Sequence, residues 1–201
     1  MASLPVNQST RIHILQLVGA LVALLIVFAH PALSGGAHEF VELTGVGLVL
    51  ICIVGRMWSI LYIGARKNAE LVTAGPYSMT RNPLYVFSTI GAVGIGLMTG
   101  SVVIALALGF VAFGILHVTA QKEAAYLRTL FGPTYDRYAA VTPLFWPNPR
   151  LYAEPQKADF SPVALRRTFV DGLVFLLAFP LIELVEYLQE SGVVPVLLNL
   201  P

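Results

Sequence analysis

The densest group of residues that could hold a ligand occupies positions 75–85, which read Gly-Pro-Tyr-Ser-Met-Thr-Arg-Asn-Pro-Leu-Tyr. The opening Gly-Pro is a turn signal, whereas Asn82 and Pro83 suit the N-cap and the first position of a helix. The first N–H groups of such a helix are free and lie at the positive end of its dipole. With Arg81 beside them, they predict a binding site for an anion.

A second group of candidate residues starts at Glu123 and continues through Leu127 and Phe131 to Tyr135 and Tyr138. A carboxylate accepts charge-assisted hydrogen bonds, and aromatic side chains provide flat apolar walls with polar tips. If the two groups meet, the site offers an anion-binding end, a carboxylate and several aromatic rings. This combination suits a zwitterionic ligand with an aromatic base and a positive centre.

The composition indicates that lipid surrounds most of the chain. Of the 201 residues, 57% are hydrophobic and 11% are charged, whereas a soluble domain carries about 25% charged residues. We therefore expect one domain over residues 1–201, of all-α class: a polytopic membrane helical bundle. Its five expected spans are Ile12–Ala29, Phe40–Ile63, Pro83–Met98, Ser101–Thr119 and Phe169–Leu188.

Only a tight turn separates the third and fourth spans, so they are expected to form a helical hairpin. The hairpin brings the cytoplasmic end of the fourth span, with Glu123, beside the start of the third, with Arg81. Glycines at positions 91, 94 and 96 of the third span predict close helix packing.

The fourth helix is expected to continue past the membrane. Helix-forming residues run to Phe131, where Gly132-Pro133 ends the helix, so that about three turns project beyond the bilayer. The stretch 135–158 is expected to be a lid or an interfacial segment, with Tyr135 in the aromatic belt. The last span contains Pro180 and several acidic residues, and it is expected either to cross the membrane or to lie partly in the interface.

The distribution of positive charge predicts the orientation. All of the 12 Lys and Arg residues except Arg56 fall in segments on one side of the expected spans, and the other side holds none. By the positive-inside rule, that side is cytoplasmic. We therefore expect an integral protein of a bacterial inner membrane, with its N-terminus and its site in the cytoplasm. Arg56 lies inside the second span, where an ionisable residue is by default a functional candidate, the alternative being an arginine that snorkels.

The two groups of residues, at this spacing, resemble the isoprenylcysteine carboxyl methyltransferase family and the related phospholipid methyltransferases. The usual family form is GPYxxxRHPxYxG followed by EExxLxxxFGxxYxxY, and Arg-x-Trp at positions 56–58 matches a further feature. The resemblance covers a core at residues 55–147, and residues 161–201 add a C-terminal helix. Three positions depart from the family form, because Asn82 replaces His, Phe87 replaces Gly and Ala124 replaces a second Glu. Phe87 is expected to narrow the pocket.

The resemblance implies transfer of a methyl group from S-adenosylmethionine to a lipid-like or small hydrophobic acceptor, through a carboxylate, thiol or amine. It assigns Arg56 and Tyr85 to catalysis. Cofactor binding is assigned to Tyr77, Arg81, Asn82, Tyr85, Glu123, Leu127, Phe131 and Tyr138.

Two other functions remain open. A membrane reductase of the sterol-reductase type would bind NADPH, but the chain has no dedicated basic cluster for the 2′-phosphate. A non-enzymatic membrane protein could keep the fold without the reaction, and the departures from the family form at Phe87 and Ala124 support this alternative. The lone Cys52 and the lack of zinc spacing predict no metal site, and the absence of a basic stripe predicts no nucleic-acid partner.

The charge distribution generates the first testable prediction. Reporter fusions or cysteine labelling should place Gly75 in the cytoplasm and Gly36 on the opposite side, because Lys and Arg are confined to one face of the membrane. Labelling of both positions from the same side would contradict this topology.

Overall fold

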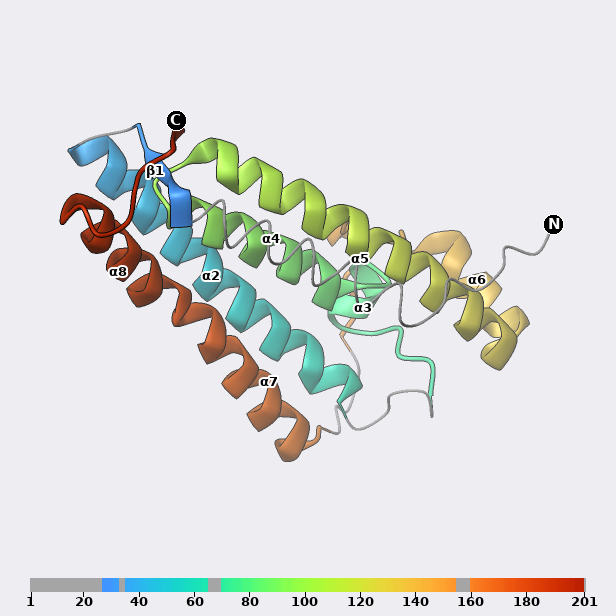
Figure 1. The fold of residues 1–201 in the computed structure, drawn as a ribbon. Helices are drawn as coiled ribbons and strands as arrows, with labels where there is room; N and C mark the ends of the chain where they lie inside the picture. Colours follow the sequence, from blue (N-terminus) through green and yellow to red (C-terminus); the bar gives the residue numbers. More distant parts are fainter. Residues whose placement is uncertain (1–26, 33–34, 65–69, 155–159, 201) are drawn as a thin grey trace.

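Long apolar helices form one bundle in the computed structural model, which describes residues 27–32, 35–64, 70–154 and 160–200 (Figure 1). The helices that run along the bundle are α2 (Gly36–Ile63), α4 (Pro83–Leu97), α5 (Val102–Phe131), α7 (Pro162–Leu176) and α8 (Ala178–Glu190). The expected all-α membrane bundle is therefore confirmed. The expected span Ile12–Ala29 lies outside the described residues, apart from positions 27–29.

A small sheet at one end of the bundle was not expected. The strands β1 (Ala29–Pro31) and β2 (Leu198–Leu200) pair in parallel, with Ala29 opposite Leu198 and Pro31 opposite Leu200. The strand β1 begins at Ala29, the last residue of the expected first span. The pairing satisfies backbone N–H and C=O groups of two segments that are far apart in the sequence.

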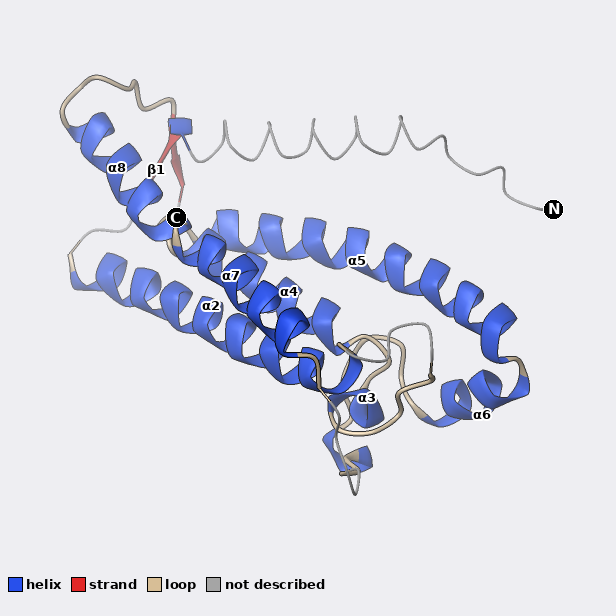
Figure 2. Cartoon of the chain, turned by 90° about the horizontal axis from the view of Figure 1, so that it is seen from below, coloured by secondary structure: helices blue, strands red, loops and turns tan. Residues whose placement is uncertain are grey.

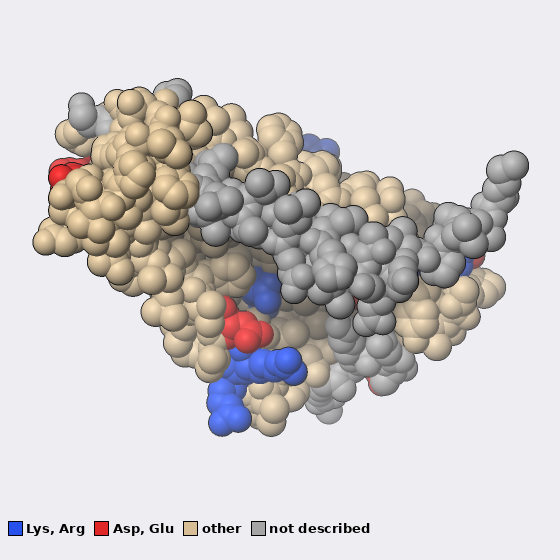
Figure 3. All heavy atoms as spheres, in the orientation of Figure 1, with Lys and Arg blue, Asp and Glu red and all other residues tan. Residues whose placement is uncertain are grey.

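Among the described residues, three helical units are long and apolar enough to cross a membrane: Gly36–Ile63, Val102–Phe131 and Pro162–Glu190. Large apolar side chains on them point outward, including Phe40 on α2, Phe110 on α5 and Val174 on α7. Much of the face drawn in Figure 3 carries no charged side chain, and no Lys or Arg is seen at the end where α8 finishes. Such a surface is compatible with lipid as the surrounding solvent.

The helices α4 and α5 form the expected hairpin. Its turn contains Gly100, whose φ of 67° lies in the left-handed region that favours glycine. The side chain of Ser101 then caps α5 by accepting a hydrogen bond from the Ile104 N–H at 3.3 Å. Because the link is so short, the two helices lie side by side along their shared length (Figure 1).

Glycines allow α4 to approach both of its neighbours, as predicted. A Cβ atom on Gly94 would lie 2.8 Å from the carbonyl oxygen of Gly45 on α2, and one on Gly96 would lie 2.3 Å from the Cα of Ala105 on α5. A Cβ on Gly91 would lie 2.6 Å from the buried Sγ of Cys52. The small residues therefore set the spacing of the central helices.

The C-terminal helical unit is longer than the predicted span Phe169–Leu188. It begins at Pro162, where the Ser161 side chain caps α7, and it ends at Glu190; its first helix, α7, packs along α2 (Figure 1). The helix breaks at Leu177, three residues before Pro180, whose ring nitrogen cannot donate to a carbonyl in the preceding turn. Gly172 packs on Ile53 of α2, with 3.1 Å between an added Cβ and Cγ2.

The loops and short helices gather at the end of the bundle where α5 finishes (Figure 2). As predicted, α5 ends at Phe131, and Gly132 follows with a φ of 55°. The chain then forms α6 (Pro133–Val141), which the sequence did not reveal, and the 3₁₀ helix η1 (Pro149–Leu151). The short helix α3 (Pro76–Met79) lies at the same end.

The packing of α4 generates a second prediction. Gly94→Ala should destabilise the protein by about 1–3 kcal/mol, because the new methyl group meets the backbone of α2 and cannot be accommodated by a side-chain rotation. Thermal unfolding of the detergent-solubilised protein measures the effect.

Gly114→Ala is the matched control, since nothing lies within 4 Å of a Cβ at that helical position. It should leave the stability unchanged or raise it slightly, because alanine is the better helix former. Equal melting temperatures for the two variants would contradict the close packing of α2 and α4.

Candidate functional site

The first candidate segment, residues 75–85, begins with a turn that requires a glycine. Gly75 has a φ of 61°, and a Cβ there would lie 2.3 Å from the ring of Tyr62. The Ser78 hydroxyl donates to the Gly75 carbonyl at 2.6 Å, and the Ser78 N–H donates to the same oxygen at 3.0 Å. The turn and α3 are therefore closed by local hydrogen bonds before α4 begins.

Residues 143–153, which we call the strap, hold this segment in place. The Thr80 hydroxyl donates to the Phe145 carbonyl at 2.7 Å, and the Arg81 N–H donates to the Pro143 carbonyl at 2.9 Å. At the other end of the strap, Gly75 and Ala153 are joined by an N–H···O bond of 2.8 Å. The strap therefore satisfies backbone and side-chain groups of the segment that would otherwise need water.

Asn82 occupies the N-cap position of α4, with Pro83 at the first helical position, but its side chain does not cap the helix. Its Nδ2 instead donates to the Leu144 carbonyl of the strap at 2.9 Å. The expectation of free N–H groups also fails for Tyr85, whose N–H donates to the Asn82 carbonyl at 3.0 Å. Fewer backbone N–H groups at this helix start are therefore available to an anion than predicted. The bond from Nδ2 to the strap gives the amide of Asn82 a structural role.

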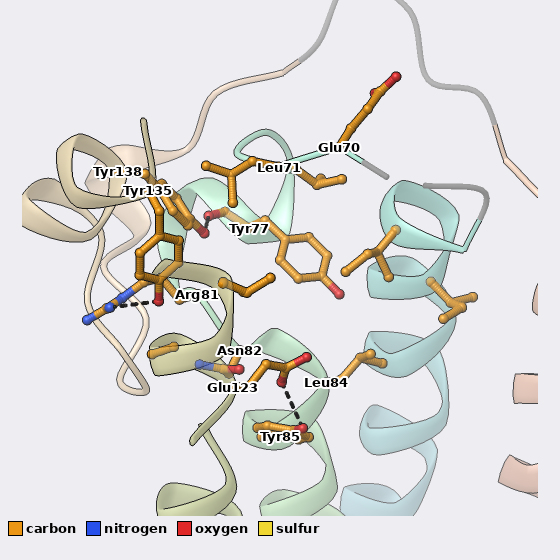
Figure 4. A pocket seen from close by; sticks show the side chains of 15 residues that line it. Glu70, Leu71, Tyr77, Arg81, Asn82, Leu84, Tyr85, Glu123, Tyr135 and Tyr138 are labelled. Atoms are coloured by element: carbon orange, nitrogen blue, oxygen red, sulfur yellow. Dashed lines mark hydrogen bonds between the residues drawn. The ribbon is translucent and has the colours of Figure 1, made fainter. Parts of the chain in front are cut away.

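A pocket opens between α2, α3, α4, α5 and α6 at this end of the bundle (Figure 4). Its cavity volume is about 130 Å³, which is smaller than that of most small-molecule sites. Seven of its lining residues were assigned to cofactor binding: Tyr77, Arg81, Asn82, Tyr85, Glu123, Leu127 and Tyr138. The structure thus brings the two groups of candidate residues together.

Arg81 and Tyr135 form one side of the pocket (Figure 4). The Arg81 guanidinium donates from Nη1 to the Tyr135 hydroxyl at 3.2 Å, while its buried Nε has no hydrogen-bond partner among the described residues. Tyr135 is only 2% exposed, so the prediction that it belongs to the aromatic belt is wrong. The α6 helix, absent from the prediction, turns its side chain inward.

Glu123 and Tyr85 form another side, where α5 and α4 lie next to each other. The Tyr85 hydroxyl donates to Oε2 of Glu123 at 2.9 Å, and both residues line the pocket. Ala124 also lines it, so that a single carboxylate from α5 faces the space where the family form has two neighbouring acidic residues. The pocket therefore presents a guanidinium and a carboxylate from different elements.

Two tyrosine hydroxyls at the pocket are kept in their protonated form. Burial raises the pKa of Tyr77, and the neighbouring Tyr138 and Glu123 raise it further. Burial also raises the pKa of Tyr138, an effect that Arg81 partly offsets. The Tyr138 hydroxyl donates to the Tyr77 carbonyl at 2.7 Å, whereas the Tyr77 hydroxyl is buried without a hydrogen-bond partner in the described residues. Tyr77 thus offers a donor to a ligand.

Two of the assigned residues do not line the pocket. Phe131 lies one turn beyond Leu127, at the end of α5. Arg56 lies deeper in the bundle, between α2, α4 and α7. Phe87 also lies elsewhere, since its ring packs edge-on against Trp58 with 6.4 Å between centroids. The expected narrowing of this pocket by Phe87 is therefore wrong.

Other lining residues were not identified from the sequence. They are Ile60 and Ile63 at the end of α2, Leu84 on α4, and the loop residues Glu70, Leu71 and Val72. The two α2 residues share one face of a helix, so their position next to the site could have been predicted from the sequence. The composition of the loop does not distinguish it from other loops. Among the described residues, no group of three or more His, Cys, Asp and Glu side chains is placed to hold a metal ion.

The strap generates a third prediction. Asn82→Ala should speed hydrogen exchange in residues 143–153 and lower stability by about 0.5–1.5 kcal/mol, because the Leu144 carbonyl loses its donor. Thr129→Ala is the control, since it removes an exposed intrahelical bond to Tyr126 far from the strap. If hydrogen exchange in the strap is unchanged in the Asn82 variant, the bond between Asn82 and Leu144 does not hold the strap in place.

Comparison with known proteins gives matches over the core and over nearly the whole chain. The phospholipid methyltransferase family matches residues 41–134. The nickel-cobalt-cadmium resistance protein NccN of Alcaligenes xylosoxydans xylosoxydans is 33% identical over 193 residues, which cover 95% of this chain and 90% of that protein. The cobalt-zinc-cadmium resistance protein CzcN of Cupriavidus metallidurans is 32% identical over 192 residues, which cover 94% and 88%.

A shorter match connects the core to an enzyme. Protein-S-isoprenylcysteine O-methyltransferase of Schizosaccharomyces pombe is 31% identical over 83 residues, which cover 40% of this chain and 35% of that protein. No solved structure matches the chain. The family match spans α4, α5 and most of α2, the helices that meet at the pocket. The chain belongs to the phospholipid methyltransferase family, which its core matches at residues 41–134, and it is similar over nearly its whole length to the two bacterial resistance proteins.

Proposed function

We propose that this protein transfers a methyl group from S-adenosylmethionine to a lipid-like or small hydrophobic acceptor at the cytoplasmic face of a bacterial inner membrane. One observation carries the proposal: the pocket at the end of the apolar bundle presents Arg81, Glu123 and the free hydroxyl of Tyr77 to the same space. Family membership supports the reaction type, and the charge distribution supports the orientation.

The residues present fit this cofactor, which carries a carboxylate, an ammonium group, ribose hydroxyls and an adenine ring. The buried Nε of Arg81 and the Oη of Tyr77 have no hydrogen-bond partner in the described residues, so both are available as donors. Arg81 would hold the carboxylate, and Glu123 would accept from the ammonium group or from ribose. Leu127, Tyr77 and Tyr138 would provide walls for the adenine.

When bound, S-adenosylmethionine supplies an electrophilic methyl group on a sulfonium centre. The chain's own residues then have to orient the acceptor and keep water out, and such positioning can account for a large part of the rate enhancement. Tyr77 and Tyr138 stay protonated because burial raises the pKa of each, so they act as donors and not as bases. Tyr85 donates to Glu123 and holds that carboxylate toward the pocket.

The alternatives make different demands on the pocket. NADPH would need several cationic side chains for its phosphates, and Arg81 is the single Lys or Arg among the residues that line the described pocket. The names of two relatives describe resistance to nickel, cobalt, zinc and cadmium. For this chain we propose that the reaction is methyl transfer. The names of the two relatives suggest that the reaction takes place in cells that resist these metals.

Binding measurements provide the fourth prediction. Glu123→Gln and Arg81→Gln should each weaken binding of S-adenosylmethionine roughly ten- to a hundredfold, since a charged hydrogen bond contributes about 1.5–3 kcal/mol. Titration calorimetry on the purified protein measures this, and NADPH is titrated in parallel.

Lys122→Gln is the matched control, because Lys122 is exposed, lies next to Glu123 and does not line the pocket. The affinity of the Lys122→Gln variant for S-adenosylmethionine should equal that of the unchanged protein. Binding of NADPH in place of S-adenosylmethionine would favour the reductase, and binding of neither would favour a non-enzymatic protein.

A further inference from the structure

An uncharged stretch runs from α6 into the strap. Residues 138–149 carry no charge, and an exposed arginine lies on each side of them, at positions 137 and 150. Within the stretch Phe145 is buried, whereas Trp146 is 68% exposed. Neither of these two rings lines the pocket. One exposed ring has little meaning by itself, so the surface around Trp146 decides what it contacts.

The ring of Trp146 continues an apolar stripe on α5. It stacks on Phe113, with 5.6 Å between ring centroids and 22° between the planes. Phe145 packs edge-on against the same Phe113 ring at 4.9 Å. Leu106 and Phe110, which are both exposed, precede Phe113 at helical spacing and share its face of α5. The exposed side of Trp146 is therefore continuous with the apolar outer surface of the bundle.

The level of Trp146 in the bundle follows from the hairpin of α4 and α5. Both helices adjoin the same tight turn and lie side by side. Helix α4 has 15 residues, and Phe113 is the twelfth residue of α5 counted from that turn. Phe113 and the ring stacked on it therefore lie beside the body of α4 and not beyond its start. A side chain at this level faces the layer that the apolar helices cross.

The backbone of the strap is suited to surroundings with little water. Three consecutive carbonyl groups, at residues 143–145, accept hydrogen bonds from the polar segment before α4. The donors are, in this order, the Arg81 N–H at 2.9 Å, Asn82 Nδ2 at 2.9 Å and the Thr80 hydroxyl at 2.7 Å. Proline, which has no N–H to satisfy, occupies positions 143, 147 and 149. Non-helical backbone at membrane depth persists where protein groups satisfy it.

We propose that Trp146, with the stripe on α5, binds the acyl chains of lipids in the leaflet on the pocket side and so seats the strap in the membrane. Acyl chains are the occupant that this surface favours, because the stripe is uncharged and continues the apolar outer side of α5. The exposed Arg137 and Arg150, at the two ends of the uncharged stretch, suit head-group phosphates. Of the two expectations for residues 135–158, a lid or an interfacial segment, these contacts support the second.

The lipid contact has a consequence for the pocket. The strap bonds fix the segment that carries Arg81 and Asn82, so lipid that holds the strap becomes part of the scaffold of the pocket. The proposal does not rest on methyl transfer, because both of its tests are made without S-adenosylmethionine.

The first test is fluorescence quenching in vesicles of phosphatidylcholine whose acyl chains carry bromine in the half nearer the head group. The chain has 2 tryptophans, so the full-length Trp58→Phe variant leaves Trp146 as the single emitter. Because bromine quenches on contact, Trp146 should lose most of its emission relative to unbrominated vesicles. Acrylamide, which stays in the water, should quench it little.

A tryptophan on the same helix but outside the membrane is the matched control. Tyr126 is exposed and lies 24 residues after Val102, about 36 Å along the axis and beyond a hydrocarbon layer of about 30 Å. With both native tryptophans replaced by phenylalanine, Tyr126→Trp should be quenched by acrylamide and not by bromine. Trp146 behaving like this control would overturn the proposal. A second copy of the chain on this face would also shield Trp146 from bromine, and that result would overturn it too.

Hydrogen exchange in the same vesicles tests whether lipid holds the strap. Trp146→Gln should speed exchange in residues 143–153 roughly tenfold, because the strap loses its apolar contact. Leu106→Gln is the control, since it places the same amide on the same stripe two turns away and should leave exchange in the strap unchanged. Equal exchange in the strap of the two variants would contradict a role for lipid in the scaffold of the pocket.

Conservative variants keep the question decidable if a substitution prevents folding. In place of Trp58→Phe, quenching of the unchanged chain is compared with that of Trp146→Phe, and the difference reports Trp146; no difference would overturn the proposal. In place of Trp146→Gln, Trp146→Ala is compared with Trp146→Phe, and exchange in the strap should be faster in the alanine variant. Equal exchange in these two variants would count against the lipid contact.

Discussion

The close contact between the backbones of α2 and α4 is the constraint on which the rest of the structure depends. At Gly45 and Gly94 neither helix has a side chain, and an added Cβ on either would come within 3 Å of the other helix's backbone. Because α4 also meets α5 at Gly96 and Ala105, it is fixed between two longer helices. This fixed position sets two cross-helix pairs, Tyr85 with Glu123 and Arg56 with Ser88. A shift of one turn in α4 would break both.

The polar residues of the segment before α4 serve two purposes. Some face the pocket, as Tyr77 and Arg81 do, whereas Thr80 and Asn82 bond to the strap. The strap bonds organise the pocket because they fix the start of α4 and the direction of the side chains that follow. A site for a flexible, charged cofactor needs such fixed donors, since ordering them during binding would reduce affinity. The polar motif therefore encodes its own scaffold as well as contacts to a ligand.

The sequence predicted those features that depend on local chemistry or on the period of apolar residues. The hairpin at Gly100, the end of α5 at Gly132 and the glycine packing of α4 are examples, since each follows from a conformational preference or a side-chain size. What the sequence did not reveal depends on contacts between distant segments. Asn82 is a good N-cap in isolation, but Leu144 provides a competing acceptor that only the folded chain brings near.

The same limit explains the errors within the candidate site. Tyr135 and Phe131 are both aromatic residues near the same end of the bundle, and their sequence context does not separate them. The structure does, because α6 folds back and buries Tyr135 beside Arg81 while Phe131 remains one turn away. The pairing of β1 with β2 was equally hidden, because it joins residues 29–31 to residues 198–200.

The length of α4 has a consequence for the surrounding bilayer. Its 15 residues extend about 22 Å, whereas the hydrocarbon layer is about 30 Å thick. The polar groups at its start, Arg81 and Asn82, are therefore held roughly 8 Å below the level that lipid tails would otherwise reach. Water and head groups must dip into the membrane at this point, as a local dimple next to the protein. Thinner bilayers should therefore accommodate the protein with less deformation.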